Sequence, residues 1–298
     1  MSRPARIVAL DDADVRPRKI ALGTFDGVHL GHREVIAGSD AVVTFEPHPL
    51  SVVSPANAPK LLTTPERKAQ LLGELGVQEL IVIPFDEAFR GRSAEAFVDE
   101  DLVGRLGATS VSVGESFRFG HGARGTPELL QADGRFAVRV VPLLEVDGEI
   151  VSSTHIRGLV AGGAVDYASR QLGAPFTLVG PVEHGDARGR TLGYPTANLV
   201  PRPGYVLPAH GVYACRVRFA GDDRDLLAAT SIGVRPQFVT GRGELVEAFV
   251  LDFSEDVYGR EMSVSFTKRL RGERKFPSVE ALIEQMDADV EQSRRLLA

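Results

Sequence analysis

The chain has 298 residues, 43% of them hydrophobic and 25% charged, with a formal net charge of −6. This composition is typical of a soluble globular protein long enough for two domains, and the acidic balance argues against a dedicated nucleic-acid-binding protein. No apolar run is long enough to span a membrane, and the charged N-terminus does not resemble a signal peptide. The single cysteine, Cys215, excludes an intrachain disulfide, and strand alternation predicts that its thiol lies in a core. We therefore expect a cytoplasmic protein with no nucleic-acid or membrane partner, and we find no sequence signal for its oligomeric state.

The first half of the chain alternates apolar, strand-like segments with amphipathic ones. Helices are predicted at 63–77, with Thr64 as the N-cap and Gly76 as the stop, and at 93–107. Near-continuous apolar strands in this β-α-β order predict a doubly wound, Rossmann-like α/β domain with a parallel sheet. Ligands of such domains bind at the carboxyl ends of the strands. The predicted strands are 19–25, 41–47, 79–85, 109–114 and 137–144.

The pattern changes near residue 175, where a proline follows a short helix that ends at Gly173. The strands predicted beyond this point are 176–182, 211–219, 226–233, 244–253 and 261–270. Because almost no helical signal separates them, they predict an antiparallel β-barrel. A C-terminal helix over 278–298 is predicted from Ser278 as N-cap and from a helical apolar period. The apolar positions of that helix are Val279, Leu282, Ile283, Met286, Val290 and Leu297. We predict two domains, 1–175 and 176–298.

The segment 23–32, GTFDGVHLGH, joins the first predicted strand to a helix that starts near His29. A helix N-terminus beside a strand end suits a phosphate, and Gly27 and Gly31 allow its close approach. His29 and His32 are three residues apart and share a helix face, where their rings can stabilise charge on a phosphate under attack. A zinc site is the weaker reading because no third ligand stands at a recognisable spacing. A β-hairpin at Asp26-Gly27 is also weaker, because the residues that follow do not alternate as a strand would. Incidental surface histidines are the remaining alternative.

The segment 184–199, HGDARGRTLGYPTANL, interleaves glycine and arginine as phosphate loops do, with Gly189 and Arg190 near its centre. Thr196 and Asn198 then supply a hydroxyl and an amide oxygen, both acceptable to Mg²⁺. A glycine-rich barrel turn with a solvated charge cluster is the alternative, and chemistry alone slightly favours that alternative.

Glu247 lies on an otherwise apolar strand face. Alternation in the strand 244–253 places it with Leu245, Phe249 and Leu251. A carboxylate there has a buried cationic partner, sits at a bulge, or lines a cavity as a general base with a raised pKa. A kinase needs such a base to deprotonate the attacking hydroxyl. The residues alone weight the buried ion pair and the general base about equally.

The motifs also resemble a known family. GTFDGVHLGH resembles the HxGH signature of nucleotidyltransferases, in the form found in bacterial bifunctional riboflavin kinase/FAD synthetases. TFEPHP (44–49), the glycine-rich loop 113–125 and VSSTHIR (151–157) resemble further motifs of the same family, and GRTLGYPTANL (189–199) resembles its flavokinase signature. GVYA, SIGVRPQF, VEAFVLDFSEDVYGR and RGERKF follow in the family's order, so the resemblance covers about residues 18–290.

The resemblance implies roles for residues at both sites. Glu247 is implied as the kinase base, and Thr196 and Asn198 as contacts of Mg²⁺ and ATP, with Gly189 and Arg190 also at the kinase ATP site. His29 and His32 are implied as catalytic in adenylylation. The ATP-binding set of that reaction is Gly23, Phe25, Asp26, Gly27, Gly31, Ser153, Thr154 and Arg157. The implied flavin contacts there are Phe45, Glu46, His48 and Phe117.

Three features depart from the family pattern. Ser116 stands where the family usually has Asp or Asn, and Gln237 stands where it has Thr. The third departure is the crossover after His32, which leaves only about two turns of helix before the next strand, whereas the family has a longer helix and loop. A shortened crossover trims one flank of the adenylylation pocket.

The function implied is flavin cofactor synthesis by a multifunctional transferase. Riboflavin would be phosphorylated to FMN by a riboflavin kinase, and FMN would then be adenylylated to FAD plus pyrophosphate, with ATP as co-substrate and Mg²⁺ as cofactor in a cytoplasmic enzyme. The first alternative is a flavokinase alone, with an impaired or repurposed N-terminal domain, which the short crossover motivates. A flavin- or nucleotide-binding regulator and a nucleotidyltransferase acting on a phosphorylated alcohol are two others, disfavoured by intact Glu247 and by the PTAN motif respectively.

Overall fold

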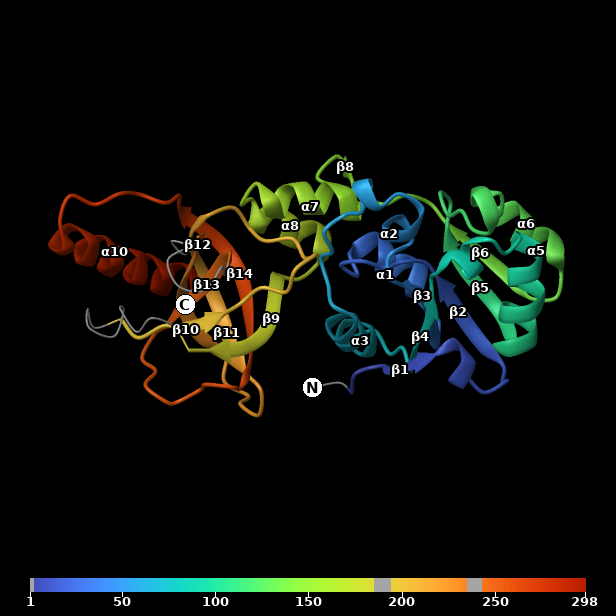
Figure 1. Ribbon diagram of the computed structural model, residues 1–298, viewed down its shortest axis with the longest axis horizontal. Coiled ribbons are helices and arrows are strands. Elements are labelled where there is room, and N and C mark those ends of the chain that lie inside the picture. Colours follow the sequence, from blue (N-terminus) through green and yellow to red (C-terminus); the bar gives the residue numbers. More distant parts are fainter. Residues whose placement is uncertain (1–2, 185–193, 235–242) are drawn as a thin grey trace. The chain divides into compact units, whose positions relative to one another are not determined.

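The computed structural model describes residues 3–184, 194–234 and 243–298 (Figure 1). The chain forms two compact units, residues 1–153 and 154–298. The predicted division at residue 175 stays a prediction; in the structure the helices between 153 and 172 group with the second unit, apart from Ser153 itself. Gly189, Arg190 and Gln237 lie outside the described residues.

The first unit is built on a six-stranded sheet in the order β1-β4-β3-β2-β5-β6, in which every neighbouring pair is parallel. All five strands expected in this half are confirmed. The additional strand β1 lies at the sheet edge, where Ile7 is 46% exposed, and its short apolar run is flanked by charge. The strands are β1 (Arg6–Ala9), β2 (Arg18–Leu22), β3 (Ala41–Glu46), β4 (Glu79–Pro84), β5 (Ala108–Gly114) and β6 (Ala137–Val141).

The strand order places a topological switch point at β2. The chain runs from β2 outward through β3 and β4, then returns to the other side of β2 for β5 and β6. In an open parallel sheet, ligands bind in the crevice at the carboxyl ends of the strands on either side of such a point. The segment 23–32 follows β2 directly and so occupies this position.

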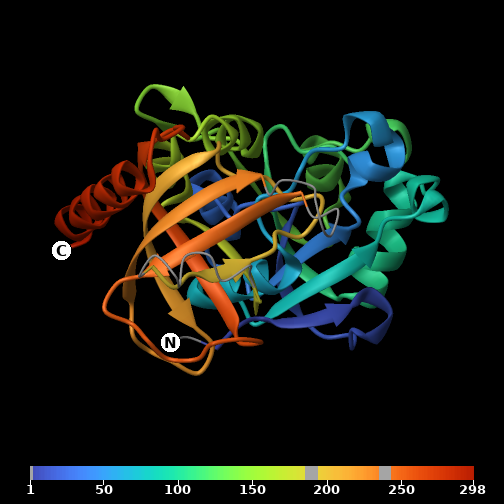
Figure 2. The same cartoon turned by 60° about the vertical axis from the view of Figure 1, so that its left-hand side comes forward.

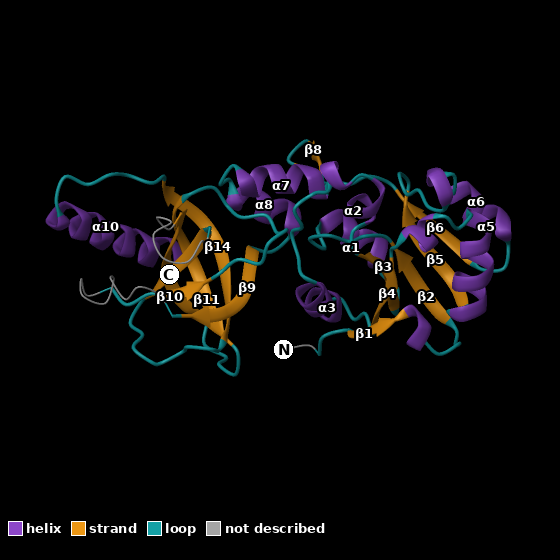
Figure 3. Cartoon of the chain, viewed as in Figure 1, coloured by secondary structure: helices purple, strands orange, loops and turns teal. Residues whose placement is uncertain are grey.

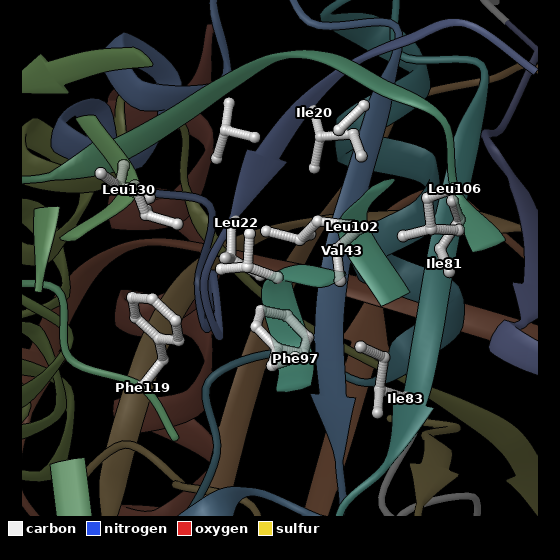
Figure 4. Packing of buried hydrophobic residues seen from close by; sticks show 14 of the residues in the cluster. Ile20, Leu22, Val43, Ile81, Ile83, Phe97, Leu102, Leu106, Phe119 and Leu130 are labelled. Carbon is white, nitrogen blue, oxygen red and sulfur yellow. The ribbon is translucent and has the colours of Figure 1, made fainter. Parts of the chain in front are cut away.

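Helices cover both faces of the sheet. Ile20, Leu22, Val43, Ile81 and Ile83 pack with Phe97, Leu102, Leu106, Phe119 and Leu130 on one face (Figure 4). Ala21, Val42 and Leu80 point to the other face and pack against α1 (Leu30–Ile36) and α3 (Pro65–Glu74). Because both faces are buried, the strands read as continuous apolar runs, and the prediction of a covered parallel sheet is confirmed.

The shorter elements connect these layers. Thr64 caps α3 as predicted, because its side chain accepts a hydrogen bond from the backbone N–H of Arg67. The segment predicted as a helix at 93–107 is helical, but most of it, η3 (Phe97–Arg105), is a π-helix. The remaining elements of this unit are η1 (Leu10–Asp12), α2 (Pro49–Val53), η2 (Pro55–Asn57), α4 (Glu87–Arg90), α5 (Ala94–Ala96), η4 (His121–Ala123), α6 (Pro127–Asp133), β7 (Glu145–Val146) and β8 (Glu149–Ile150).

The second unit is the predicted antiparallel barrel. Its strands curve into a closed barrel (Figure 2). Their order around the barrel is β10-β13-β12-β11-β14-β9. Two helices, α7 (Ser153–Ala161) and α8 (Val165–Leu172), precede the barrel, and α10 (Val279–Leu297) follows it (Figure 3). The strands are β9 (Phe176–Glu183), β10 (Ala197–Leu199), β11 (Gly211–Phe219), β12 (Leu226–Val234), β13 (Glu244–Val250) and β14 (Glu261–Arg271).

Cys215 is buried in the barrel core, as predicted, on the same face of β11 as Tyr213 and Val217. The C-terminal helix begins at its predicted cap, since the Ser278 side chain accepts from the backbone N–H of Ala281. Its predicted apolar face is only partly correct. Leu297 is buried, but Val279 is 52% exposed, and the helix also buries a carboxylate, Asp289, which Arg271 of β14 binds at 2.8 Å.

None of the helices in the described part of the chain is long and apolar enough to cross a membrane.

Candidate active sites

The turn after β2 has an unusual backbone. Phe25, Gly27 and Val28 have φ angles of 48°, 88° and 43°. Positive φ is ordinary for glycine but strained for Phe and especially for β-branched Val. Both of these side chains are buried, Phe25 at 2% exposure and Val28 at 0%. Strain of this kind persists only where surrounding contacts over-determine the backbone, and it concentrates at functional sites.

Asp26 ties this turn to the loop that precedes α3. Its buried carboxylate accepts from the backbone N–H of Leu62 at 2.9 Å, and from the backbone N–H and hydroxyl of Thr63 at 3.1 and 3.2 Å. The Thr63 hydroxyl oxygen in turn accepts from the backbone N–H of Gly27 at 3.1 Å. The Asp26 carboxylate therefore joins the turn to the 62–63 loop through several hydrogen bonds, and these bonds fix the conformation of the turn.

The two histidines lie together at the start of α1. His29 is the N-cap, and its Nδ1 accepts from the backbone N–H of His32 at 3.2 Å. The two imidazole rings stack with centroids 3.4 Å apart, and the Phe25 ring meets His32 edge-on at 5.2 Å. A Cβ added at Gly31 would lie 3.4 Å from the His29 ring, so the glycine leaves room for that ring. The predicted helix start and the pairing of the histidines are confirmed.

The described residues contain no group of three or more His, Cys, Asp or Glu side chains that could hold a metal ion. The histidine pair instead shares its turn with a hydroxyl from far along the chain. Ser153 Oγ donates to the backbone carbonyl of Asp26 at 2.9 Å, so the predicted phosphate motif begins beside the predicted HxGH turn. Thr154 and Arg157 follow in α7 and fall in the second unit.

The four predicted flavin contacts occupy different environments. Phe45 is 8% exposed and packs in an aromatic cluster with Phe85 and Phe89, each at 5.9 Å between ring centroids. Phe117 is partly buried and stacks on Phe119 at 5.6 Å. Glu46 is exposed, while His48 caps α2, its Nδ1 accepting from the backbone N–H of Leu50. Sequence reasoning missed Phe85 and Phe89, which lie just beyond β4 and are partly exposed. The available signal was a phenylalanine at the end of the predicted strand 79–85, followed by a second one four residues later.

Lys68 was also missed. It is 7% exposed, and its Nζ donates to the backbone carbonyl of Thr24 at 2.7 Å. The signal was its place one helical turn before Leu72 on the buried side of α3, where an ordinary surface lysine does not lie.

In the barrel, the predicted kinase residues meet across paired strands. Asn198 of β10 lies directly opposite Glu247 of β13 and, on its other side, opposite Glu183 of β9. Directly opposed residues in an antiparallel pair have their Cβ atoms about 5 Å apart. Asn198 is 4% exposed and Glu247 is partly buried. The strand pairing thus brings together the buried amide of Asn198 and the carboxylates of Glu247 and Glu183. The sequence analysis missed Glu183 because it did not predict the strand β10.

Tyr194 anchors the PTAN segment that leads into β10. Its ring meets Phe249 of β13 edge-on at 5.0 Å, and its hydroxyl donates to Asp287 of α10. Burial and this carboxylate raise the pKa of Tyr194 to about 12, so the phenol remains a donor near neutral pH. Thr196 follows two residues later and is partly buried, on the same side of the extended chain as Asn198.

The donor chemistry of this segment fits Mg²⁺. That ion takes hard oxygen ligands, retains several waters, and is usually held by one or two protein oxygens together with the phosphates of the substrate. The Thr196 hydroxyl and the Asn198 amide oxygen match that small donor set.

Comparison with known proteins assigns each unit separately. Residues 11–155 match a family model described as FAD synthetase, and residues 172–297 match one described as riboflavin kinase. A bifunctional riboflavin kinase/FMN adenylyltransferase from Listeria monocytogenes is 39% identical over 94% of this chain and 92% of its own length. The enzyme of that name from Bacillus subtilis is 36% identical over 93% and 91%.

The chain belongs to the bifunctional riboflavin kinase/FMN adenylyltransferase family. This confirms the resemblance seen in the motifs. The fold is shared over the whole chain with a solved structure, a macrolide-efflux protein from Streptococcus pneumoniae, at 31% identity and a TM-score of 0.86, covering 97% of this chain and 98% of that one. The FAD synthetase model matches the segment that contains the strained turn. The riboflavin kinase model matches the barrel that contains the Asn198–Glu247 pair.

Proposed function

We propose that the chain makes FAD from riboflavin in two ATP-dependent steps, phosphorylation in the barrel and adenylylation in the α/β unit. The observation that carries this proposal is the agreement of each family model with its own constellation of side chains. The barrel has Asn198 opposite Glu247, and the α/β unit has stacked His29 and His32 at the switch point of its sheet.

In the kinase step, Glu247 is the base. Its carboxylate accepts the proton of the terminal ribityl hydroxyl of riboflavin, while the hydroxyl oxygen attacks the γ-phosphorus of ATP and the bond to ADP breaks. Thr196 and Asn198 would hold Mg²⁺ with the ATP phosphates, and the bound ion would offset the negative charge of those phosphates. Gly189 and Arg190 complete the proposed ATP site.

In the adenylylation step, an oxygen of the FMN phosphate attacks the α-phosphorus of ATP and pyrophosphate leaves. No protein nucleophile is required, so catalysis comes from positioning and charge stabilisation. His29 and His32 are the proposed stabilising groups. The proposed ATP contacts are Gly23, Phe25, Asp26, Gly27, Gly31, Ser153, Thr154 and Arg157. For the flavin we propose Phe117, Glu46 and His48 as contacts. Phe45 is buried, and we propose that it supports the flavin site by packing against Phe85 and Phe89.

We further propose a cytoplasmic location and no nucleic-acid or membrane partner. The single buried cysteine and the net charge of −6 support this proposal.

The decisive assay uses the purified chain with riboflavin, Mg²⁺ and ATP, followed by chromatographic separation of the flavins. FMN and FAD together support the proposal. FMN alone would mean a flavokinase with an inactive first unit, and unchanged riboflavin would mean a binding protein.

Two substitutions assign the activities to their sites. We expect His32→Ala to lower FMN-to-FAD conversion by about 10²- to 10³-fold, since it removes a group that stabilises developing charge, and to spare riboflavin phosphorylation. We expect Glu247→Ala to lower phosphorylation by about 10²- to 10⁴-fold and to spare adenylylation, since it removes the base. The spared activity is the internal control for folding, and Glu261→Ala, at an exposed barrel glutamate, is the matched control for Glu247. If folded samples of both variants lose both activities, the two-site assignment is wrong.

A further inference from the structure

Lys68 is a buried lysine that the two reaction schemes above do not use. It lies on the side of α3 that packs against the sheet, among Ala69 and Leu72. Burial lowers the pKa of the Lys68 ammonium, whereas the nearby carboxylates of Asp26 and Glu46 act in the opposite direction. An apolar side chain would occupy such a position without a desolvation cost. The contribution specific to lysine is therefore the set of hydrogen bonds that its ammonium donates.

Those hydrogen bonds converge on one backbone carbonyl. Lys68 Nζ donates to the Thr24 carbonyl oxygen at 2.7 Å, and the Thr44 hydroxyl donates to the same oxygen at 3.0 Å. Lys68 Nζ also lies 3.5 Å from the Thr44 hydroxyl oxygen, which closes a small network between α3, β3 and the turn. The next residue after Thr24 is Phe25, with its strained φ of 48°. The network therefore fixes the backbone at Thr24, immediately before the residue with a positive φ angle.

The turn transmits this constraint to two groups of the adenylylation site. The Phe25 ring lies over Gly23, where an added Cβ would be 3.1 Å from it, and the same ring meets the imidazole of His32. One residue on, the Asp26 carbonyl accepts the Ser153 hydroxyl. A shift of the Thr24 carbonyl would consequently move both His32 and Ser153, one through an aromatic contact and the other through a hydrogen bond.

We propose that Lys68 is a positioning residue for adenylyl transfer, holding the 24–27 turn so that His32 and Ser153 keep their places. This inference rests on the adenylylation function proposed above. It adds a residue that acts through the backbone and through other side chains. Because misplacement of reacting groups by about 1 Å can cost about 10²-fold in rate, Lys68 affects the chemical step more than ground-state binding of ATP or FMN.

The test uses the full chain with Lys68→Met, which keeps the length of the side chain and removes the ammonium, and with Lys68→Arg. Lys19→Met, at an exposed lysine near the amino end of β2, is the control. We expect Lys68→Met to lower kcat for FMN-to-FAD conversion by about 10- to 100-fold, with KM for ATP and FMN changed by no more than about threefold. Riboflavin phosphorylation should be unchanged, and Lys68→Arg should recover part of the lost kcat because a charged donor remains.

A milder variant keeps the proposal testable if Lys68→Met does not fold. Thr44→Val removes the second donor to the Thr24 carbonyl while preserving shape, and we expect kcat for adenylylation to fall by about 3- to 10-fold, with phosphorylation intact. Wild-type chain that makes no FAD would refute the proposed function itself. Wild-type activity combined with unchanged kcat in the folded variants would refute the role of Lys68. A rise in KM at constant kcat would also refute that role, because it indicates a contribution to binding.

Discussion

Glu79, the first residue of β4, is a buried carboxylate surrounded by arginines. Its side chain is 4% exposed, and it accepts from Arg16 at 2.6 Å, from fully buried Arg18 at 3.0 Å, and from Arg6. Burial alone would raise the pKa of this carboxyl, but the hydrogen bonds from Arg6, Arg18 and Arg16 outweigh it and lower the pKa to about 2. The group lies at the amino ends of the strands, the end of the sheet opposite to the ligand site, so its role is stability.

This pKa sets the pH range of the stability that Glu79 contributes. A carboxyl whose pKa is depressed on folding stabilises the protein above its unfolded pKa and loses that contribution as the pH falls toward its folded pKa. We expect Glu79→Gln to cost about 3 kcal/mol near neutral pH, because buried Arg18 loses one of its two carboxylate partners and keeps only Asp14. The difference from wild type should shrink between the ordinary pKa of 4.5 and about 2. Urea unfolding at several pH values measures it. Glu87→Gln, in an exposed ion pair with Arg90, should cost little, and a wild-type difference that grows on acidification would contradict the assignment.

At the scale of the element, α1 shows how a helix of seven residues survives as a crossover. Arg139 of β6 reaches across to its carboxyl end, where its guanidinium donates to the carbonyls of Glu34, Val35 and Ala37 at 2.5 to 3.0 Å. Ser112 of β5 also donates to the Val35 carbonyl, at 2.6 Å. Side chains of two strands thus donate hydrogen bonds to the last carbonyls of α1. In a longer helix, the backbone N–H groups of the next turn would fill this role. The short crossover expected from the sequence is real, and its end is firmly attached.

We therefore expect Arg139→Met to lower the free energy of unfolding of the first unit by about 1–2 kcal/mol, since the Glu34 and Ala37 carbonyls lose the guanidinium while the Val35 carbonyl keeps Ser112. Adenylylation should fall as α1 and its histidines loosen, while riboflavin phosphorylation should not change. Denaturant unfolding and the two flavin assays measure these effects. Arg135→Met, which removes an exposed arginine just before β6, is the matched control and should leave the rate of adenylylation near that of wild type. An equal loss in the two variants would mean that capping is not the cause.

Local pattern predicted most strands in both units, and it failed where tertiary pairing or helix type decides the element. Continuous apolar runs identified β2 to β5, which are largely buried on both faces, and also β6, an edge strand with no fully buried residue. The strand β10 was missed because it has only three residues and follows Pro195, so tertiary pairing and not local propensity makes it a strand. The π-helical turns of η3 were missed because the apolar spacing that predicts an α-helix does not distinguish the two.

At the scale of the whole molecule, each unit has a core of its own. The α/β unit buries two apolar clusters on the faces of its sheet, and the barrel buries Cys215 and its neighbours inside a closed ring of strands. The motif histidines lie in one unit and Glu247 in the other, whereas Thr154 and Arg157 of the proposed adenylylation set fall in the same unit as the barrel. The motifs predicted which half of the chain matches which family model. Physical adjacency, such as Glu183 beside Asn198, required the strand register.

Two separate cores predict two unfolding transitions in a calorimetric scan of the full chain. Glu79→Gln should lower the temperature of one transition, and Arg271→Met, which leaves Asp289 of α10 buried without its cation, should lower the other. A single transition shifted equally by both substitutions would show that the units unfold together.

The register of β10 has a consequence for which changes in length the kinase site tolerates. Asn198 faces Glu247 because of the ladder, and its neighbours in the strand are Ala197 and Leu199. Since successive strand residues point to opposite faces, one residue inserted or deleted between the Tyr194 anchor and Asn198 would present a methyl or isobutyl group where the amide now stands. A change in the length of this segment would therefore remove the amide from its place opposite the carboxylate in a single step.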